Sequence, residues 1–237
     1  MTYNLIKVNL WFLLMITAVI FDMDGVLADT QRDHARIESQ LLAEKGISLT
    51  PEEITRRFAG VCSSVWIPTI MNQYGASGAE ELLERLYPLI EAEARKEVRE
   101  IPGASDLVRR TSSYGLSLGV ASSSRPEYID LVIKSLGICS YFKTLTSARE
   151  VENGKPAPDV FLLAAKRLGS DPYSSVVVED GLNGMIGAYE GGFPCIGLDP
   201  DNMLDVPENT LRVNSLSEVT LERLMSIHNV VKIKRKK

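Results

Sequence analysis

Residues 19–30 read Val-Ile-Phe-Asp-Met-Asp-Gly-Val-Leu-Ala-Asp-Thr, and this stretch decides the fold because it joins a strand pattern to two carboxylates. The largely apolar, β-branched run 17–21 is typical of a strand covered on both faces. Side chains two apart on an extended chain lie on one side, so Asp22 and Asp24 are expected to share a space at the carboxyl end of that strand. Gly25 then permits a sharp turn. The spacing predicts a nucleophile beside its acid/base partner.

Two carboxylates side by side in a partly dry crevice require a neighbouring cation. At ~4 Å and an effective dielectric of ~20 their repulsion costs about 4 kcal/mol. Lys155, in a turn-rich stretch before a helix-periodic run, is one candidate cation. Glu179 and Asp180 follow the short buried strand 176–178 and offer hard oxygen ligands. Together with Asp22 they predict a Mg²⁺ site that also takes phosphate oxygens and water.

A run of serines supplies hydroxyl groups at the end of another predicted strand, 116–121. Ser122 is placed to donate a hydrogen bond to an anionic oxygen. Ser124, with Glu127 three residues on, is predicted to cap a helix, whose N-terminus also attracts anions. A carboxylate nucleophile, metal ligands, a lysine and a hydroxyl are the groups needed for phosphoryl transfer through an aspartyl-phosphate.

These motifs resemble, in their order along the chain, those of the haloacid dehalogenase-like superfamily, and within it the β-phosphoglucomutase-like phosphatases. The resemblance covers nearly all of residues 15–224. It is carried by four motifs: Asp22-Met-Asp24-Gly-Val, Ala121-Ser122-Ser123, Gly154-Lys155-Pro-Ala-Pro-Asp159 and Val178-Glu179-Asp180-Gly-Leu-Asn-Gly184. It implies a Mg²⁺-dependent enzyme that acts on a small phosphorylated metabolite.

The resemblance also implies catalytic roles. Asp22 would attack phosphorus, while Asp24 would protonate the leaving oxygen and later activate water. Mg²⁺ would be bound by Asp22, the backbone carbonyl of Asp24 and Asp180. Glu179 is either a further ligand of the metal or a partner that braces Asp180.

Five positions are expected to contact phosphate or substrate. Ser122 and Lys155 would hold the phosphoryl oxygens, and Ser123 lies next to them. His34, one turn into the first predicted cap helix, faces the active site or packs between helices. Arg125 contacts substrate or is simply solvated.

The resemblance implies that Asp24, two residues after the nucleophile, restricts the reaction to phosphate ester hydrolysis or to that of a phosphomutase. Position 63 helps to distinguish these two reactions. The mutases of this branch place an arginine there to hold the second phosphate of a bisphosphate intermediate, whereas this chain has Ser63. Loss of a bidentate anion clamp favours a phosphatase. A sugar phosphomutase remains the alternative. A catalytically idle binding module is disfavoured because the set of reactive residues is complete.

Composition limits the partners. The 237 residues are 45% hydrophobic and 24% charged with a net charge of −5, which argues against nucleic acid or an anionic membrane as principal partner. Three widely spaced cysteines indicate reduced thiols in a cytoplasmic protein. The apolar run 10–21 is too short to cross a bilayer as a helix. We expect a monomer or a weak dimer.

The alternation of strands and helices predicts an α/β fold: a doubly wound parallel sheet, Rossmann-like, with an inserted all-helical cap domain. The core would comprise residues 15–30 and 100–225, and the cap 31–99. Within the cap, Thr30 with Asp33 predicts a capped helix start. Predicted cap helices are 30–46, 51–58, 64–74 and 77–100; core strands are 17–21, 116–121, 144–146, 176–178 and 194–198; core helices are 126–136, 158–168 and 183–190.

The two ends are expected to lie outside these domains. Residues 1–14 would be a mis-assigned upstream extension or a loosely attached arm, because family members begin shortly before the first strand. Residues 226–237 are predicted to form a basic C-terminal tail, and we expect its last part, the run 232–237, to be solvated.

Overall fold

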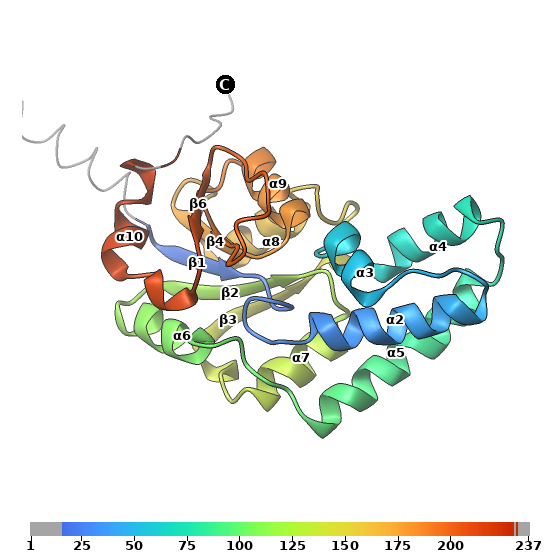
Figure 1. The fold of residues 1–237 in the computed structure, drawn as a ribbon. Coiled ribbons are helices and arrows are strands. Elements are labelled where there is room, and N and C mark those ends of the chain that lie inside the picture. Colours follow the sequence, from blue (N-terminus) through green and yellow to red (C-terminus); the bar gives the residue numbers. More distant parts are fainter. Residues whose placement is uncertain (1–15, 230, 232–237) are drawn as a thin grey trace, which may run out of the picture.

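The computed structural model describes residues 16–229 and residue 231, and its centre is a six-stranded parallel sheet (Figure 1). The strand order is β3-β2-β1-β4-β5-β6. This order reverses direction between β1 and β4, and ligands of such sheets bind at the carboxyl ends of the strands beside that point. The strands are β1 (Ala18–Phe21), β2 (Ser117–Ser122), β3 (Phe142–Ser147), β4 (Ser175–Glu179), β5 (Cys195–Leu198) and β6 (Thr210–Val213).

Helices cover both faces of the sheet, which explains why β1 is buried along its whole length. Val19 and Phe21 belong to the larger apolar cluster, on the side of α6 and α7. Ala18 and Ile20 belong to the cluster on the side of α8 and α9. These helices are α6 (Ala104–Ser113), α7 (Pro126–Ser135), α8 (Asp159–Leu168) and α9 (Leu182–Gly191), and a short α10 (Leu221–Met225) follows β6. The predicted doubly wound α/β fold is confirmed.

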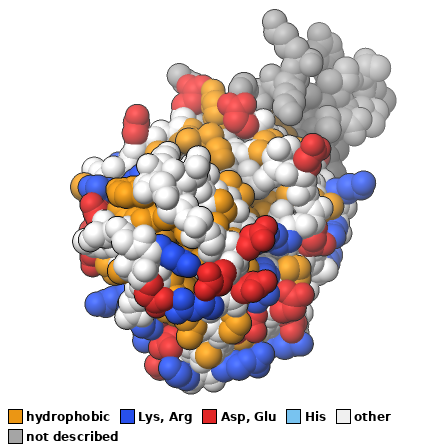
Figure 2. Space-filling view, turned by 90° about the vertical axis from the view of Figure 1, so that its right-hand side faces the viewer, with side chains coloured by type: hydrophobic (Ala, Val, Ile, Leu, Met, Phe, Trp, Pro, Cys, Tyr) orange, Lys and Arg blue, Asp and Glu red, His pale blue; other side chains and the backbone are white. Residues whose placement is uncertain are grey.

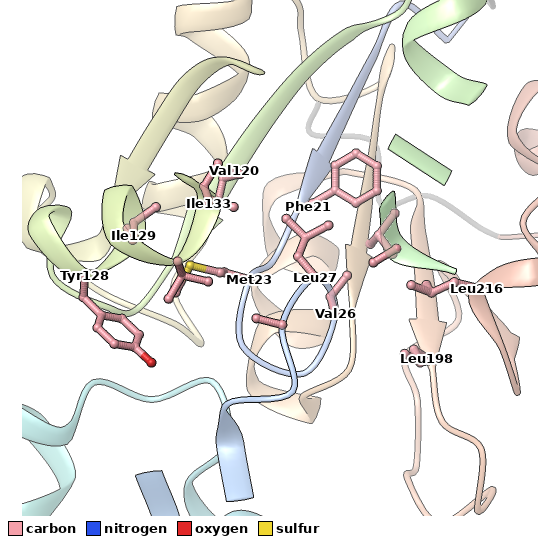
Figure 3. Close-up of a cluster of buried hydrophobic side chains, with 14 of the residues drawn as sticks. Phe21, Met23, Val26, Leu27, Val120, Tyr128, Ile129, Ile133, Leu198 and Leu216 are labelled. Carbon is pink, nitrogen blue, oxygen red and sulfur yellow. The ribbon is translucent and has the colours of Figure 1, made fainter. Parts of the chain in front are cut away.

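The loop after β1 is anchored by its own apolar side chains. Met23, Val26 and Leu27 are fully buried and join Phe21 in the larger cluster (Figure 3). Met23 therefore fixes the backbone between the two aspartates from the side opposite their carboxyl groups.

A cap of four helices separates β1 from β2 in the chain and lies beside the sheet in Figure 1. The helices are α2 (Gln31–Glu44), α3 (Pro51–Phe58), α4 (Ser63–Gln73) and α5 (Ala79–Lys96). Helix α3 begins with a capping box, because the Thr50 hydroxyl accepts from the Glu53 amide at 3.2 Å and the Glu53 carboxylate accepts from the Thr50 amide at 2.8 Å. The inserted helical cap is thus confirmed, and 31–99 stays our prediction for its bounds.

Some elements differ from the prediction. The last cap helix ends at Lys96, because Glu100 pairs with Ala28 in a β-bridge instead of continuing the helix. Helix α6 and strand β6 were not predicted, since both are rich in polar residues.

The predicted extension 1–14 lies outside the described residues, and so do residues 230 and 232–237 of the predicted tail. The predicted tail starts too early, because Ile227 and Val231 are buried in the larger apolar cluster. Among the helices the structure describes, none is long and apolar enough to span a bilayer.

Candidate active site

A cleft of about 840 Å³, including its open mouth, lies where the carboxyl ends of β1 and β2 meet the cap. Asp22 and Asp24 line it from the core. The lining from the cap includes Gln31, His34, Glu38, Ser63 and Trp66.

Lys155 brings two predicted site residues together. Its ammonium group donates to the Asp22 carboxylate and, at 2.6 Å, to Oε1 of Glu179. The Lys155 side chain is completely buried, and so is that of Glu179. Lys155 is therefore the cation that the paired carboxylates were predicted to need.

Glu179 is bonded at both of its carboxylate oxygens. Oε1 accepts from Lys155, while Oε2 accepts from the backbone amides of Asp180 at 2.8 Å and Gly181 at 2.7 Å. One carboxylate oxygen from each of Asp22, Glu179 and Asp180 lies within 4.8 Å of the other two. The three residues form an acidic cluster that could hold a metal ion.

Gln31 joins this cluster, although no sequence motif singled it out. Its amide nitrogen donates both to the backbone carbonyl of Asp24, at 2.8 Å, and to Oδ2 of Asp180, at 2.7 Å. These two oxygens therefore converge on one point. Gly25 makes room for them, because a Cβ there would lie 2.1 Å from Oδ2 of Asp180, and its φ of +94° also favours glycine.

Burial dominates the electrostatics of the cluster. It raises the pKa of Asp22 to about 8, with Glu179 and Asp24 adding to this shift and Lys155 opposing it. Burial likewise raises the pKa of Asp180, and the charges of Glu179 and Asp22 add to that. For Lys155 burial lowers the pKa, but Asp22 and Glu179 outweigh it and raise the pKa above its usual value. The site holds more negative than positive charge.

Hydroxyl groups orient Asp24. Thr30 donates to its Oδ1 at 2.5 Å and Ser124 to its Oδ2 at 2.8 Å, while Ser122 is more distant from Oδ2, at 3.4 Å. Thr30 stands at the N-cap position of α2, as predicted, but its side chain makes no capping bond. The prediction that Ser124 caps the next helix was wrong, because Arg125 is the N-cap of α7. The hydroxyls are bonded to Asp24 instead.

Two residues that were predicted to contact substrate, Ser123 and Arg125, link the core to the cap. The Ser123 hydroxyl donates to the Gly60 carbonyl at 2.6 Å. Arg125 forms an ion pair with Glu91 of α5, and its guanidinium carbon lies 4.3 Å from the centre of the Tyr87 ring. The cleft lining includes all four side chains that make these contacts: Ser123, Arg125, Glu91 and Tyr87.

His34 faces the cleft and also packs against the core. Its Nε2 lies 2.8 Å from the Tyr128 hydroxyl, which is at the edge of the apolar cluster in Figure 3. Contacts of His34, Ser123 and Arg125 with substrate stay a prediction.

The cap wall contains a carboxylate that the sequence analysis missed. Glu38 is only 5% exposed and accepts a hydrogen bond from the Ser63 hydroxyl at 2.7 Å. Burial raises its pKa, whereas the Ser63 bond and His34 lower it and Asp24 raises it further. The only sequence signal was spacing, because Gln31, His34 and Glu38 recur at helical intervals on one face of α2.

Comparison with known proteins identifies the family of this chain. A family model described as "Haloacid dehalogenase-like hydrolase" matches residues 19–198. "Hexitol phosphatase B" of Escherichia coli (strain K12) is 28% identical over 89% of this chain and 97% of its own length. "Phosphorylated carbohydrates phosphatase" of Thermotoga maritima is 30% identical over 74% of this chain and 81% of its own length.

Solved structures agree on the fold. The crystal structure of β-phosphoglucomutase from Clostridium difficile superposes with a TM-score of 0.81, at 24% identity, over 91% of this chain and 98% of that one. At this identity the similarity concerns the fold alone.

Proposed function

The chain belongs to the haloacid dehalogenase-like hydrolases, and from that premise we propose that it is one of their β-phosphoglucomutase-like phosphatases and hydrolyses small phosphate monoesters, chiefly sugar phosphates, through an aspartyl-phosphate. The predicted enzyme class, a phosphoric monoester hydrolase, is confirmed by the relatives named as phosphatases. The predicted small-molecule partner agrees with the surface of the cap side, where charges of both signs are interspersed (Figure 2). Cytoplasmic location and a monomer or weak dimer stay part of the proposal.

The observation that carries the proposal is that Asp22 and Asp24 line the core side of one cleft, with the buried Lys155 bonded to Asp22. An Asp22 oxygen would form a bond to phosphorus as the ester P–O bond breaks, and Asp24 would give its proton to the leaving oxygen. A water molecule would then attack the phosphorus of the acyl phosphate while Asp24 takes its proton. Inorganic phosphate leaves and Asp22 is restored. Thr30 and Ser124 keep the Asp24 carboxyl in place for both proton transfers.

The donor set fits Mg²⁺. It consists of hard oxygens, and the acidic side chains around it outnumber the one ammonium group that contacts them in the described part of the chain. We assign Asp22, Asp180 and the Asp24 carbonyl as the groups that would hold the ion, and Glu179 as a brace for Lys155, since its oxygens are already bonded. When bound, the ion would supply positive charge that offsets repulsion between Asp22 and the phosphoryl oxygens.

The test is phosphate release by the purified full-length chain. We expect turnover of p-nitrophenyl phosphate and of several sugar phosphates with Mg²⁺, and its loss with a chelator. Asp22→Asn should lower kcat at least about a thousandfold, because the nucleophile is removed. Asp106→Asn, which changes an exposed carboxylate paired with Arg110, is the matched control and should keep wild-type kcat. No phosphate release from any ester, or full activity of Asp22→Asn, would refute the proposal.

A sugar phosphomutase is the second candidate, because a mutase shares the fold. Incubation with β-glucose 1-phosphate and a trace of the bisphosphate separates the two. A phosphatase yields glucose and free phosphate, whereas a mutase yields glucose 6-phosphate without free phosphate.

A further inference from the structure

We propose that Glu38, together with Ser63, reads the end of the substrate remote from the phosphoryl group, selecting leaving groups that donate hydrogen bonds and rejecting those that carry a second phosphate. This inference rests on the proposed function and deepens it by naming the substrate class: monophosphates of polyhydroxy compounds. Glu38 would be a specificity residue and would take no part in bond cleavage.

The position of Glu38 on α2 supports this role. Gln31, on the same helix face, contacts Asp24 and Asp180 at the acidic end of the cleft. Glu38 lies seven residues further along the helix, a rise of about 10 Å. That distance is roughly the length of a phosphorylated six-carbon chain, so a substrate with its phosphorus at Asp22 would bring its far hydroxyls toward Glu38.

Glu38 also has unused bonding capacity. Its Oε1 accepts from Ser63, while Oε2 has no hydrogen-bond partner among the described residues, although the residue is only 5% exposed and lines the cleft. Among the described residues, the fully buried side-chain oxygens and nitrogens without a partner do not include Oε2, so this oxygen is open to the cleft. A hydroxyl or amine of a bound ligand would satisfy it.

A second phosphate on the substrate would be disfavoured at this end of the cleft. The Ser63 hydroxyl is already donated to Glu38 and leaves no cation at this position. Arg125, which also lines the cleft, is paired with Glu91. Arg149 lines the cleft too and keeps its charge, because its bond, at 2.7 Å, is to the neutral Tyr87 hydroxyl. A distal phosphate directly beside Glu38 and Ser63 would nevertheless face a carboxylate of like charge in a partly dry site.

Binding of compounds that the enzyme cannot cleave tests the inference without turnover. The probes are the phosphonate analogues of sorbitol 6-phosphate and of sorbitol 1,6-bisphosphate, titrated calorimetrically into the full chain. We expect wild type to bind the monophosphonate at least about tenfold more tightly, and Glu38→Gln to reduce that preference about tenfold by removing the charge. Ser63→Arg, a second variant, should shift the preference in the same direction by placing a cation beside Glu38.

The control is Glu44→Gln, on the same helix but half-exposed and paired with Arg85, which should keep the wild-type preference. Equal preferences in wild type and Glu38→Gln, with Ser63→Arg also unchanged, would overturn the inference. Because binding is the readout, that outcome is distinct from failure of the proposed function, which would appear only as absence of phosphate release.

Discussion

The two ends of the cleft are built differently. At the core end, Lys155 and Glu179 have fully buried side chains, and each carboxylate oxygen of Glu179 has a hydrogen-bond donor. At the cap end, Glu38 is buried with one oxygen bonded to Ser63 and the other without a partner in the described residues. The difference teaches that the core end is held together by its own hydrogen bonds, whereas the cap end keeps an acceptor oxygen for which we propose a donor on the ligand.

The largest expected effect comes from removing the cation of the core end. Lys155→Met should lower the free energy of unfolding by about 3–5 kcal/mol, because Asp22 and Glu179 would remain buried without their partner. It should also lower kcat by at least about a hundredfold, because the phosphoryl oxygens lose a nearby charge. Urea denaturation and phosphate release measure the two effects. Lys166→Met, on the exposed side of α8, is the control. Unchanged stability of Lys155→Met would mean that the core end is not held by this ion pair.

An intermediate effect is expected from filling space beside Glu179. A Cβ at Gly184 would lie 1.7 Å from Oε1 of Glu179, the oxygen that accepts from Lys155. Gly184→Ala should therefore destabilise the protein by about 1–3 kcal/mol, even though alanine favours a helix. Thermal unfolding checks this. Gly154→Ala, whose Cβ would meet nothing closer than 3.7 Å, should stay within about 0.5 kcal/mol of wild type. Equal destabilisation by both changes would contradict a packed core end.

The smallest effect should come from the boundary between the two ends, at Thr30. Thr30→Val removes the hydroxyl bond to Oδ1 of Asp24 but leaves the bond from Ser124. We expect kcat to fall about tenfold with KM little changed, because a bond to a charged group is lost and binding groups remain. Thr55→Val, at another cleft-lining threonine of the cap, is the matched comparison for side-chain shape. A change in KM alone would assign Thr30 to recognition instead of to the orientation of Asp24.

The core end was largely predictable because its residues follow strands. Asp22 and Asp180 come directly after β1 and β4, and adjacent parallel strands end at the same edge of the sheet, so spacing and strand pattern together predicted their meeting. The family model that matches residues 19–198 confirms the predicted family, and the parallel sheet confirms the predicted fold. The catalytic roles assigned to Asp22 and Asp180 stay a prediction until the variants are measured.

The cap end was not predictable to the same degree. Gln31 and Glu38 reach the cleft because of the way α2 is rotated and placed against the core, which tertiary packing decides and no local motif records. Thr30 and Ser124 were assigned to helix caps because their sequence context matches a capping pattern, but bonds to Asp24 compete with that use of a hydroxyl. Ser63 was noticed only as a departure from the mutases.

The absence of a side chain at Gly25 matters when related sequences are compared by their acidic motifs. Because residue 25 has no Cβ, the side chains of Asp180 and Gln31 can approach the backbone there. A methyl group at this position would overlap both side chains. A related chain that retained every carboxylate but carried alanine at this position would look intact when its acidic residues are compared. Such a chain would nevertheless have to displace both side chains and strain its backbone at a φ of +94°, so the absence of a methyl group here should be considered beside the acids.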